Sequence, residues 1–298
     1  MSVFKGSAVA IVTPFHDDAE KTVNYDAFAD FIDYQIDNGT DAIVVCGSTG
    51  EAATMTEEEH VAVCKFCAEH VNHRVPVIAG TGSNCTKTAI QLSEEIASFG
   101  VDACLVVTPY YNKPTQACLV EHFREIAEAV PKTPIIMYNV PSRTGGNLLP
   151  QTAAKIVREV PNVVGIKEAS GNISQIVKLM AETDGKIELY SGNDDQTVPM
   201  MAMGGLGVIS VVANVAPKAM HDMCAKFFAG DVAGAAKIQC ETEELFECLF
   251  SEVNPIPVKK AVNLLGFEAG PLRMPLMEMS KDKAEALEEA MKRFGCHR

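Results

Sequence analysis

The sequence predicts a (β/α)8 (TIM) barrel followed by a small C-terminal helical domain. Apolar runs rich in Val and Ile alternate along the chain with amphipathic helical patterns. Within each run the apolar residues are continuous rather than alternating, which is typical of parallel strands covered on both faces. Eight such runs, the number that closes this kind of barrel, begin at Ser7, Ala42, Pro76, Ala103, Pro134, Val163, Ile187 and Leu206.

A doubly wound open sheet is the structural alternative. Such a sheet usually carries a glycine-rich nucleotide fingerprint after its first strand. Here the first run ends in Thr13-Pro14-Phe15, and the chain contains no G-x-G-x-x-G. The barrel is therefore the better prediction.

Helical patterns occupy the intervals between the predicted strands. They cover residues 25–38, 56–72, 85–99, 115–130, 150–160, 172–182, 195–203 and 219–228. Beyond Pro217 we expect no further strand, and helices are predicted at 232–250, 257–265 and 281–294. The expected division is a barrel of residues 1–230 and a helical domain of residues 231–298.

Composition argues against several function classes. The chain has 298 residues, of which 47% are hydrophobic, and a formal net charge of −14. An acidic surface disfavours nucleic acid or an anionic membrane as a partner. The uncharged stretch 196–217 is interrupted by Pro199 and by glycines. We therefore expect a helix, a turn and a strand there rather than a membrane span.

The ten cysteines are expected to be reduced, because no signal-peptide pattern is visible and the chain is too long for a small disulfide scaffold. A cytoplasmic location is the corresponding expectation. His60, Cys64 and Cys67 share one stripe of a predicted helix. Since no second CxxC accompanies them, the stripe is a weak zinc signal, and we expect packing there rather than a metal.

A lysine at the end of the sixth predicted strand is the main candidate for chemistry. Strand alternation places Val163, Gly165 and Lys167 on one face, with the glycine leaving space beside the lysine and the valines forming a dry wall. Loss of hydration lowers the pKa of a lysine. The resulting neutral amine is the nucleophile of Schiff-base chemistry. A solvated lysine at a strand end is the alternative interpretation.

Other polar residues follow the strands at the same end of the barrel, where active sites of this fold lie. The turn from Gly47 to Glu51 contains two hydroxyls and can direct its N–H groups toward a carboxylate. Tyr138 is expected to point into the barrel mouth as a proton shuttle. Arg143, on the following loop, can bind a carboxylate with two hydrogen bonds. Taken singly, these residues also fit a plain turn, a structural tyrosine and a solvated arginine.

Three motifs carry a resemblance to a known family: GSTGE at 47–51, YNVPSRTG at 138–145 and GIKEASGN at 165–172. Together they resemble the pyruvate-dependent class I aldolases, and within these the dihydrodipicolinate synthase family. The similarity extends from AIVTPF at 10–15 to NPIPVK at 254–259. It implies a barrel enzyme that condenses pyruvate with L-aspartate 4-semialdehyde, opening lysine and diaminopimelate biosynthesis.

The resemblance also implies roles for single residues at the pyruvate site. Lys167 is expected to form an imine with pyruvate, while Thr49 and the loop amides from Gly47 onward bind its carboxylate. Tyr138, Ser48 and a second tyrosine, described next, would relay protons. Because the covalent imine is the electron sink, the resemblance implies neither a metal nor an organic cofactor. Serine at position 48, where threonine is commoner, keeps the hydroxyl.

Four further residues match positions of the same family. Tyr111 would enter the site of a neighbouring subunit, which implies a homo-oligomer, expected as a tetramer built from two dimers. Arg143 matches the residue that binds the carboxylate of aspartate semialdehyde. Gly192 and Ile209 match backbone contacts around the imine.

Two other functions remain as alternatives. N-acetylneuraminate lyase and the 2-keto-3-deoxy sugar acid aldolases share the scaffold, the lysine and the tyrosine, but a polyhydroxylated substrate does not require Arg143. A non-catalytic barrel that binds a keto acid is the second alternative. A phosphate-dependent isomerase is disfavoured, because Asp194 and Asp195 after the seventh strand would repel phosphate.

Regulation by lysine is expected to be weak or absent. Feedback-sensitive relatives carry a histidine and a glutamate at the positions of Glu57 and Thr88, while His60, Asn84 and Tyr110 match. Without that glutamate, the α-ammonium group of lysine lacks its natural partner.

Overall fold

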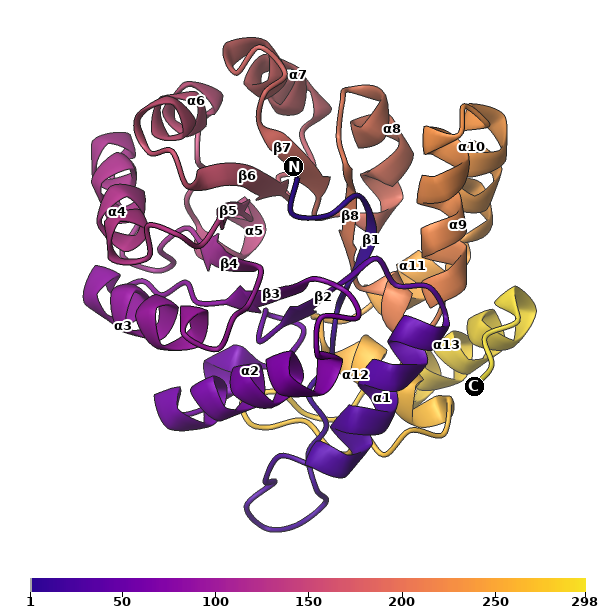
Figure 1. Cartoon of the computed structure of the whole chain (residues 1–298). Helices are drawn as coiled ribbons and strands as arrows, with labels where there is room; N and C mark the ends of the chain where they lie inside the picture. Colours follow the sequence, from indigo (N-terminus) through magenta and orange to yellow (C-terminus); the bar gives the residue numbers. More distant parts are fainter. Residues whose placement is uncertain (1) are drawn as a thin grey trace.

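The computed structural model describes residues 2–298 and contains eight parallel strands closed into one barrel, ringed by helices (Figure 1). Each strand pairs with its neighbour in the sequence, and β8 returns to β1. This confirms the predicted fold. The strands are β1 (Gly6–Ala10), β2 (Ala42–Val45), β3 (Val77–Gly80), β4 (Ala103–Val107), β5 (Ile135–Asn139), β6 (Val163–Glu168), β7 (Glu188–Ser191) and β8 (Gly207–Ser210).

The outer helices lie where the periodic patterns predict them. Several begin at a side-chain cap: Asn24, Thr56, Thr115 and Asn172 each accept a hydrogen bond from a backbone N–H of the first helical turn. The outer helices are α1 (Tyr25–Asp37), α2 (Glu57–Val71), α3 (Thr86–Ala97), α4 (Gln116–Ala129), α6 (Pro150–Glu159), α7 (Ile173–Glu182), α8 (Thr197–Ala202) and α9 (Pro217–Phe228).

One short helix, α5 (Pro141–Thr144), lies directly after β5 and is absent from the predicted pattern. Pro141 occupies its first turn, where a missing N–H costs nothing, and Gly145 ends it in the left-handed conformation. Four residues are too few to show a helical period. Short 3-10 turns also follow three of the strands: η1 (Ala52–Thr54), η2 (Asp194–Gln196) and η3 (Val212–Asn214).

The C-terminal region is helical, with α10 (Val232–Glu241), α11 (Glu243–Leu249), α12 (Ile256–Leu264) and α13 (Lys281–Phe294). The single helix predicted over 232–250 is divided at Thr242, whose hydroxyl bonds back to the Gln239 carbonyl. Val258 and Val262 of α12 pack in the same cluster as Val9 and Ile11 at the barrel. The barrel and the C-terminal helices therefore share one hydrophobic cluster, and the expected domain boundary at residue 230 remains a prediction.

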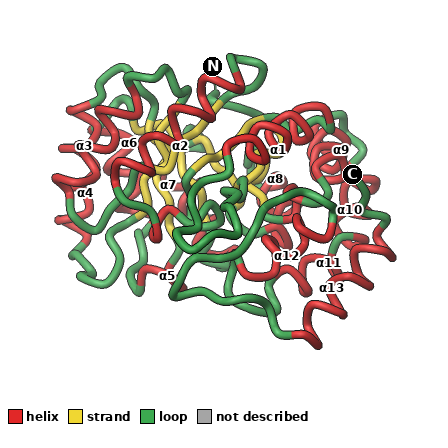
Figure 2. Tube along the Cα trace, turned by 90° about the horizontal axis from the view of Figure 1, so that it is seen from below, coloured by secondary structure: helices red, strands yellow, loops and turns green. Residues whose placement is uncertain are grey.

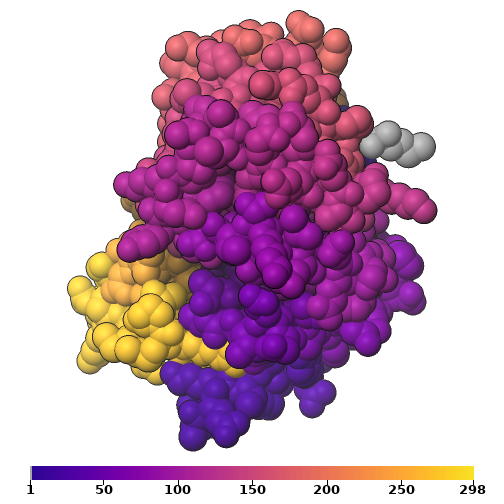
Figure 3. All heavy atoms as spheres, turned by 90° about the vertical axis from the view of Figure 1, so that its left-hand side faces the viewer, coloured from indigo at the N-terminus to yellow at the C-terminus, as the bar shows by residue number. Residues whose placement is uncertain are grey.

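The carboxyl ends of the strands face the C-terminal helices. Figure 2 shows α5, α11, α12 and α13 on the side of the barrel opposite the N-terminus, which lies near the start of β1. In Figure 3 the yellow C-terminal residues lie against the indigo N-terminal part of the chain. Within the described residues, no helix combines the length and apolar character needed to cross a membrane.

A β-bulge between β5 and β6 corrects one prediction. Ile135 pairs with Val163 but Ile136 pairs with Gly165, so one extra residue is inserted into β6. Val163 consequently packs in the outer cluster with Ile166 and does not share the face of Lys167. A Cβ at Gly165 would lie 2.7 Å from the carbonyl oxygen of Glu188. This glycine therefore accommodates the neighbouring strand β7 rather than the lysine.

Candidate active site

A cavity of about 340 Å³ opens at the carboxyl ends of the strands. It contains most of the predicted site residues, which come from the carboxyl ends of four strands, β2, β5, β6 and β7, and from the segments that follow them. The predicted residues that line it are Gly47, Ser48, Thr49, Tyr138, Arg143, Lys167 and Gly192. The valines of β6, which were predicted to form a dry wall, do not line the cavity. Apolar residues that do line it include Ala10, Val44, Leu105, Val140, Ala169 and Val211.

Lys167 is buried near the carboxyl end of β6, with 7% of its surface exposed. It is the register partner of Tyr138 on β5, and its Nζ lies 4.5 Å from the centroid of the tyrosine ring. Burial lowers the pKa of Lys167 to about 8; the charge of Asp194 opposes this shift and that of Arg143 adds to it. The fraction of neutral amine near physiological pH is thus much larger than for an ordinary lysine.

Asp194 is a buried residue that the sequence reasoning did not assign to the lysine. It lies in η2 beyond β7, and its carboxylate accepts hydrogen bonds from the Ser210 hydroxyl and from the Val211 N–H at 3.0 Å. Burial raises the pKa of Asp194, while these hydrogen bonds and the charge of Lys167 lower it. In the sequence it was visible only as one half of an acidic pair, with nothing to show which member turns inward.

Tyr138 lies beside the lysine, with its ring buried. Burial raises the pKa of its hydroxyl, opposed by the charge of Arg143 and by a side-chain hydrogen bond with Ser48. The two hydroxyls and the amine therefore line one cavity, in which Lys167 and Tyr138 are buried and Ser48 is exposed. Such an arrangement can move a proton to or from an oxygen that develops next to Lys167.

The turn from Gly47 to Glu51 has the geometry of an anion site. The N–H groups of Gly50 and Glu51 close the turn onto the carbonyls of Gly47 and Ser48. Among the described residues, the N–H groups of Ser48 and Thr49 have no hydrogen-bond partner. Two adjacent amides and a hydroxyl at the wall of the cavity can bind a carboxylate.

Asn254 connects the two predicted carboxylate-binding elements. Its side-chain Nδ2 donates to the Thr49 hydroxyl at 3.0 Å, and its backbone carbonyl oxygen accepts from Arg143 Nη2 at 3.0 Å. It also lines the cavity, and its buried Oδ1 has no partner among the described residues. The residue begins the NPIPVK motif, but nothing in that motif indicates a contact with residues more than 100 positions earlier.

The remaining predicted residues lie in three different environments. A Cβ at Gly192 would stand 2.7 Å from Ala169 Cβ and 3.2 Å from Lys167 Cε, so only glycine fits beside the lysine. Ile209 is buried in the barrel interior and is not part of the cavity wall. Tyr111 is 88% exposed, has a φ of 72° and does not line the cavity.

Potential metal ligands cluster behind the turn, in a combination that differs from the predicted stripe. Ligand atoms of Cys46, His60 and Cys64 lie within 4.8 Å of one another. His60 Nε2 is already 2.7 Å from the Gly80 carbonyl, and burial raises the pKa of Cys64 well above its usual range. A metal ion requires deprotonated thiols, so the His60 contact and the raised pKa of Cys64 favour side-chain packing over a metal site here. That no metal binds at this cluster remains a prediction. All ten cysteines are free.

A family model described as the dihydrodipicolinate synthetase family matches residues 3–294. A protein of Lachnoclostridium phytofermentans named 4-hydroxy-tetrahydrodipicolinate synthase is 55% identical over 295 residues, 99% of both chains. The crystal structure of dihydrodipicolinate synthase from Aquifex aeolicus matches with a TM-score of 0.95 and 42% identity, covering 98% of this chain and 99% of that chain.

A second solved structure, described as the first monomeric dihydrodipicolinate synthase variant, matches with a TM-score of 0.95 and 42% identity. The match covers 99% of this chain and 98% of that chain. These likenesses extend over the whole barrel and the C-terminal helices and confirm the resemblance seen in the three motifs. The chain belongs to the dihydrodipicolinate synthetase family.

Proposed function

We propose that the chain condenses pyruvate with L-aspartate 4-semialdehyde, the activity for which its relatives are named 4-hydroxy-tetrahydrodipicolinate synthase. The observation that carries the proposal is the buried amine of Lys167, which stands beside the Tyr138 ring in a cavity that also contains an anion-binding turn and a guanidinium. We place the reaction in lysine and diaminopimelate biosynthesis and in the cytoplasm.

In the first half of the reaction, the turn containing Ser48 and Thr49 binds the carboxylate of pyruvate and directs its carbonyl carbon toward Lys167. The neutral amine attacks this carbon, and the carbonyl oxygen becomes a hydroxyl. Tyr138, held by Ser48, donates the proton with which that hydroxyl leaves as water. The product is a protonated imine on Lys167, which serves as the electron sink, so the proposal requires no metal and no organic cofactor.

In the second half, the methyl group of the bound pyruvate gives a proton to the Tyr138 oxygen, which the first half left deprotonated, and the imine becomes an enamine. Its terminal carbon attacks the aldehyde carbon of aspartate semialdehyde, whose carboxylate is bound by Arg143. The aldehyde C=O bond opens, its oxygen takes the proton back from Tyr138 to become a hydroxyl, and the imine on Lys167 is regenerated. The amino group of the second substrate then closes the ring on the imine carbon and displaces Lys167. Addition of the lysine amine to pyruvate and closure of the ring both make the former carbonyl carbon tetrahedral. The absence of a side chain at Gly192 leaves room for this carbon beside Lys167 Cε.

The position of Arg143 favours this reaction over sugar acid cleavage. Arg143 lines the cavity and is held by the Asn254 carbonyl, so its charge is available to a carboxylate-bearing aldehyde. The relatives reported above carry the synthase name, and the lyase and sugar acid aldolase alternatives are not favoured. The non-catalytic alternative is disfavoured by the lowered pKa of a buried amine.

We propose a homo-oligomer, a tetramer of two dimers, in which Tyr111 completes the site of a neighbouring subunit. An aromatic side chain that is 88% exposed on a backbone with positive φ is costly in a monomer. The neighbouring Tyr110 is also exposed, so the segment after β4 presents two consecutive tyrosines to the surface.

Borohydride reduction in the presence of pyruvate is expected to attach pyruvate covalently to Lys167. Mass spectrometry should find the adduct on the peptide that contains Lys167, and Lys167→Ala should lose the adduct and at least about a thousandfold in kcat/KM. Lys155→Ala, an exposed lysine on α6, is the matched control. Full turnover by Lys167→Ala, or faster cleavage of N-acetylneuraminate than turnover of aspartate semialdehyde, would contradict the proposal.

The rate of imine trapping is expected to rise with pH through a midpoint near 8, because the neutral amine reacts and burial lowers the pKa of Lys167 to about 8. Asp194→Asn removes the negative charge that raises this pKa, so the midpoint should move to lower pH. Asp195→Asn, a cavity residue next in the chain, should leave the midpoint in place. An unchanged midpoint in Asp194→Asn would show that its charge does not act on the lysine.

Mixing two impaired variants tests the contribution of Tyr111 across an interface. Tyr111→Phe removes the relay hydroxyl and should lower kcat by about ten- to a hundredfold, while Lys167→Ala cannot form the imine. Hybrids assembled from both contain one complete site, so activity after mixing should exceed the sum of the separate activities. A fully active monomer in sedimentation analysis, or no complementation, would contradict the proposal.

Lysine is expected to inhibit weakly or not at all, because Thr88 stands where feedback-sensitive relatives carry the glutamate that pairs with the α-ammonium group, and Glu57 stands in place of their histidine. The measurement is a dose response of the condensation rate to lysine. The Glu57→His and Thr88→Glu double variant should gain inhibition relative to the wild type. Strong inhibition of the wild type at sub-millimolar lysine would show the expectation to be wrong.

A further inference from the structure

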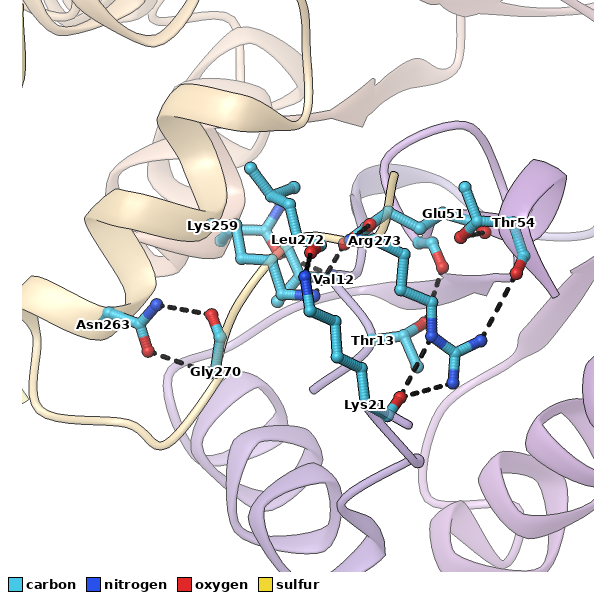
Figure 4. A network of polar contacts seen from close by, with 12 residues as sticks. Val12, Thr13, Lys21, Glu51, Thr54, Lys259, Asn263, Gly270, Leu272 and Arg273 are labelled. Carbon is cyan, nitrogen blue, oxygen red and sulfur yellow. Dashed lines mark hydrogen bonds and ion pairs between the residues drawn. The ribbon is translucent and has the colours of Figure 1, made fainter. Parts of the chain in front are cut away.

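Two sequence motifs end in charged residues that the proposed reaction does not use. Glu51 ends the GSTGE turn, and Lys259 ends the NPIPVK stretch on α12. The structure brings them together: Lys259 Nζ lies 2.6 Å from Glu51 Oε1, and each side chain is only 1% exposed (Figure 4). A buried ion pair is rarely kept for stability alone, because desolvation offsets most of the attraction.

The second carboxylate oxygen of Glu51 is also occupied. Its Oε2 accepts a hydrogen bond from the backbone N–H of Arg273 at 3.1 Å. The Arg273 guanidinium in turn donates to the Lys21 carbonyl and forms an ion pair with Glu59 (Figure 4 shows the Lys21 contact). The Phe15 ring lies against both cations, 3.8 Å from Lys259 Nζ and 4.0 Å from Arg273 Cζ. The Glu51 side chain is thus held from two sides by the C-terminal region.

The backbone of Glu51 belongs to the anion-binding turn. Glu51 has a φ of 57°, in the left-handed region, and its N–H donates to the Ser48 carbonyl at 3.2 Å. One residue earlier, the Gly50 carbonyl accepts from the Thr13 hydroxyl at 2.8 Å. The free N–H groups of Ser48 and Thr49 lie inside this closed turn. Contacts that hold Glu51 therefore also hold the closed turn that carries these two amides, whose residues line the cavity.

The other side of the turn is held by the start of the same C-terminal stretch. Asn254 Nδ2 donates to the Thr49 hydroxyl, five residues before Lys259 reaches Glu51. The segment 254–259 thus contacts the turn at two points, one at the substrate-facing hydroxyl and one behind it. A stretch that served only to close the core would not need polar contacts at both points.

We propose that Glu51 is a positioning residue for the keto acid: its contacts with Lys259 and Arg273 fix the orientation of the Ser48 and Thr49 amides that bind the pyruvate carboxylate. This inference rests on the proposed function. It assigns the affinity for pyruvate to the C-terminal region as well as to the barrel. It also predicts an effect on the first substrate that is separate from any effect on the second.

The test replaces both charges at once, by Glu51→Met together with Lys259→Met, so that no unpaired charge stays buried. KM for pyruvate, and the pyruvate concentration that gives half-maximal borohydride trapping, should rise about tenfold. The KM for aspartate semialdehyde and kcat should change less than about threefold, because Lys167 and Arg143 are untouched. Ile126→Ala, a fully buried residue on α4, is the control for lost stability and should lower Tm without raising KM.

A second variant keeps the test decisive if the double variant does not fold. Asn263→Ala removes the two hydrogen bonds to Gly270 that hold the segment leading to Arg273, and should raise KM for pyruvate about threefold. A folded double variant, or failing that Asn263→Ala, with an unchanged KM for pyruvate overturns the inference. Absence of condensation activity in the wild type would instead overturn the proposed function, so the two failures are distinct.

Discussion

Removal of water from one ammonium group is the constraint on which the rest of the site depends. Lys167 is buried in the barrel, and burial alone would make its charged form very unfavourable. Asp194 offsets part of this cost from one side, while Arg143 adds to it from the other. The balance leaves the pKa of the lysine near 8, well below that of an ordinary lysine.

The barrel sets this balance by bringing short strand ends to one rim. β5 places Tyr138 opposite Lys167, and the glycine at 192 admits the lysine stem between neighbouring segments. Asp194 is fixed by Ser210 and by backbone N–H groups beyond β8. The positions of Lys167, Tyr138 and Asp194 therefore depend on a backbone that the closed sheet determines.

The sequence predicted the repeating elements well because their signals are local. Each strand and outer helix has its own apolar run or cap, and the lysine, the tyrosine and the turn follow from strand ends. The β5–β6 bulge could not be predicted, since alternation assumes an uninterrupted register, and Val163 was therefore assigned to the wrong face. Asn254 and Asp194 were missed for a different reason. Their roles depend on contacts with residues distant in the chain, which a motif does not display.

The contacts between residues 254–273 and the turn at 47–51 have a consequence for synthesis of the protein. The turn leaves the ribosome well before Asn254, Lys259 and the Arg273 N–H, which hold it and follow their partners by 205 to 222 residues. A nascent barrel can form its strands in order yet lacks the groups that fix its anion-binding amides. The orientation of this turn is thus completed only when the C-terminal helices pack against the barrel, and not by the strands alone.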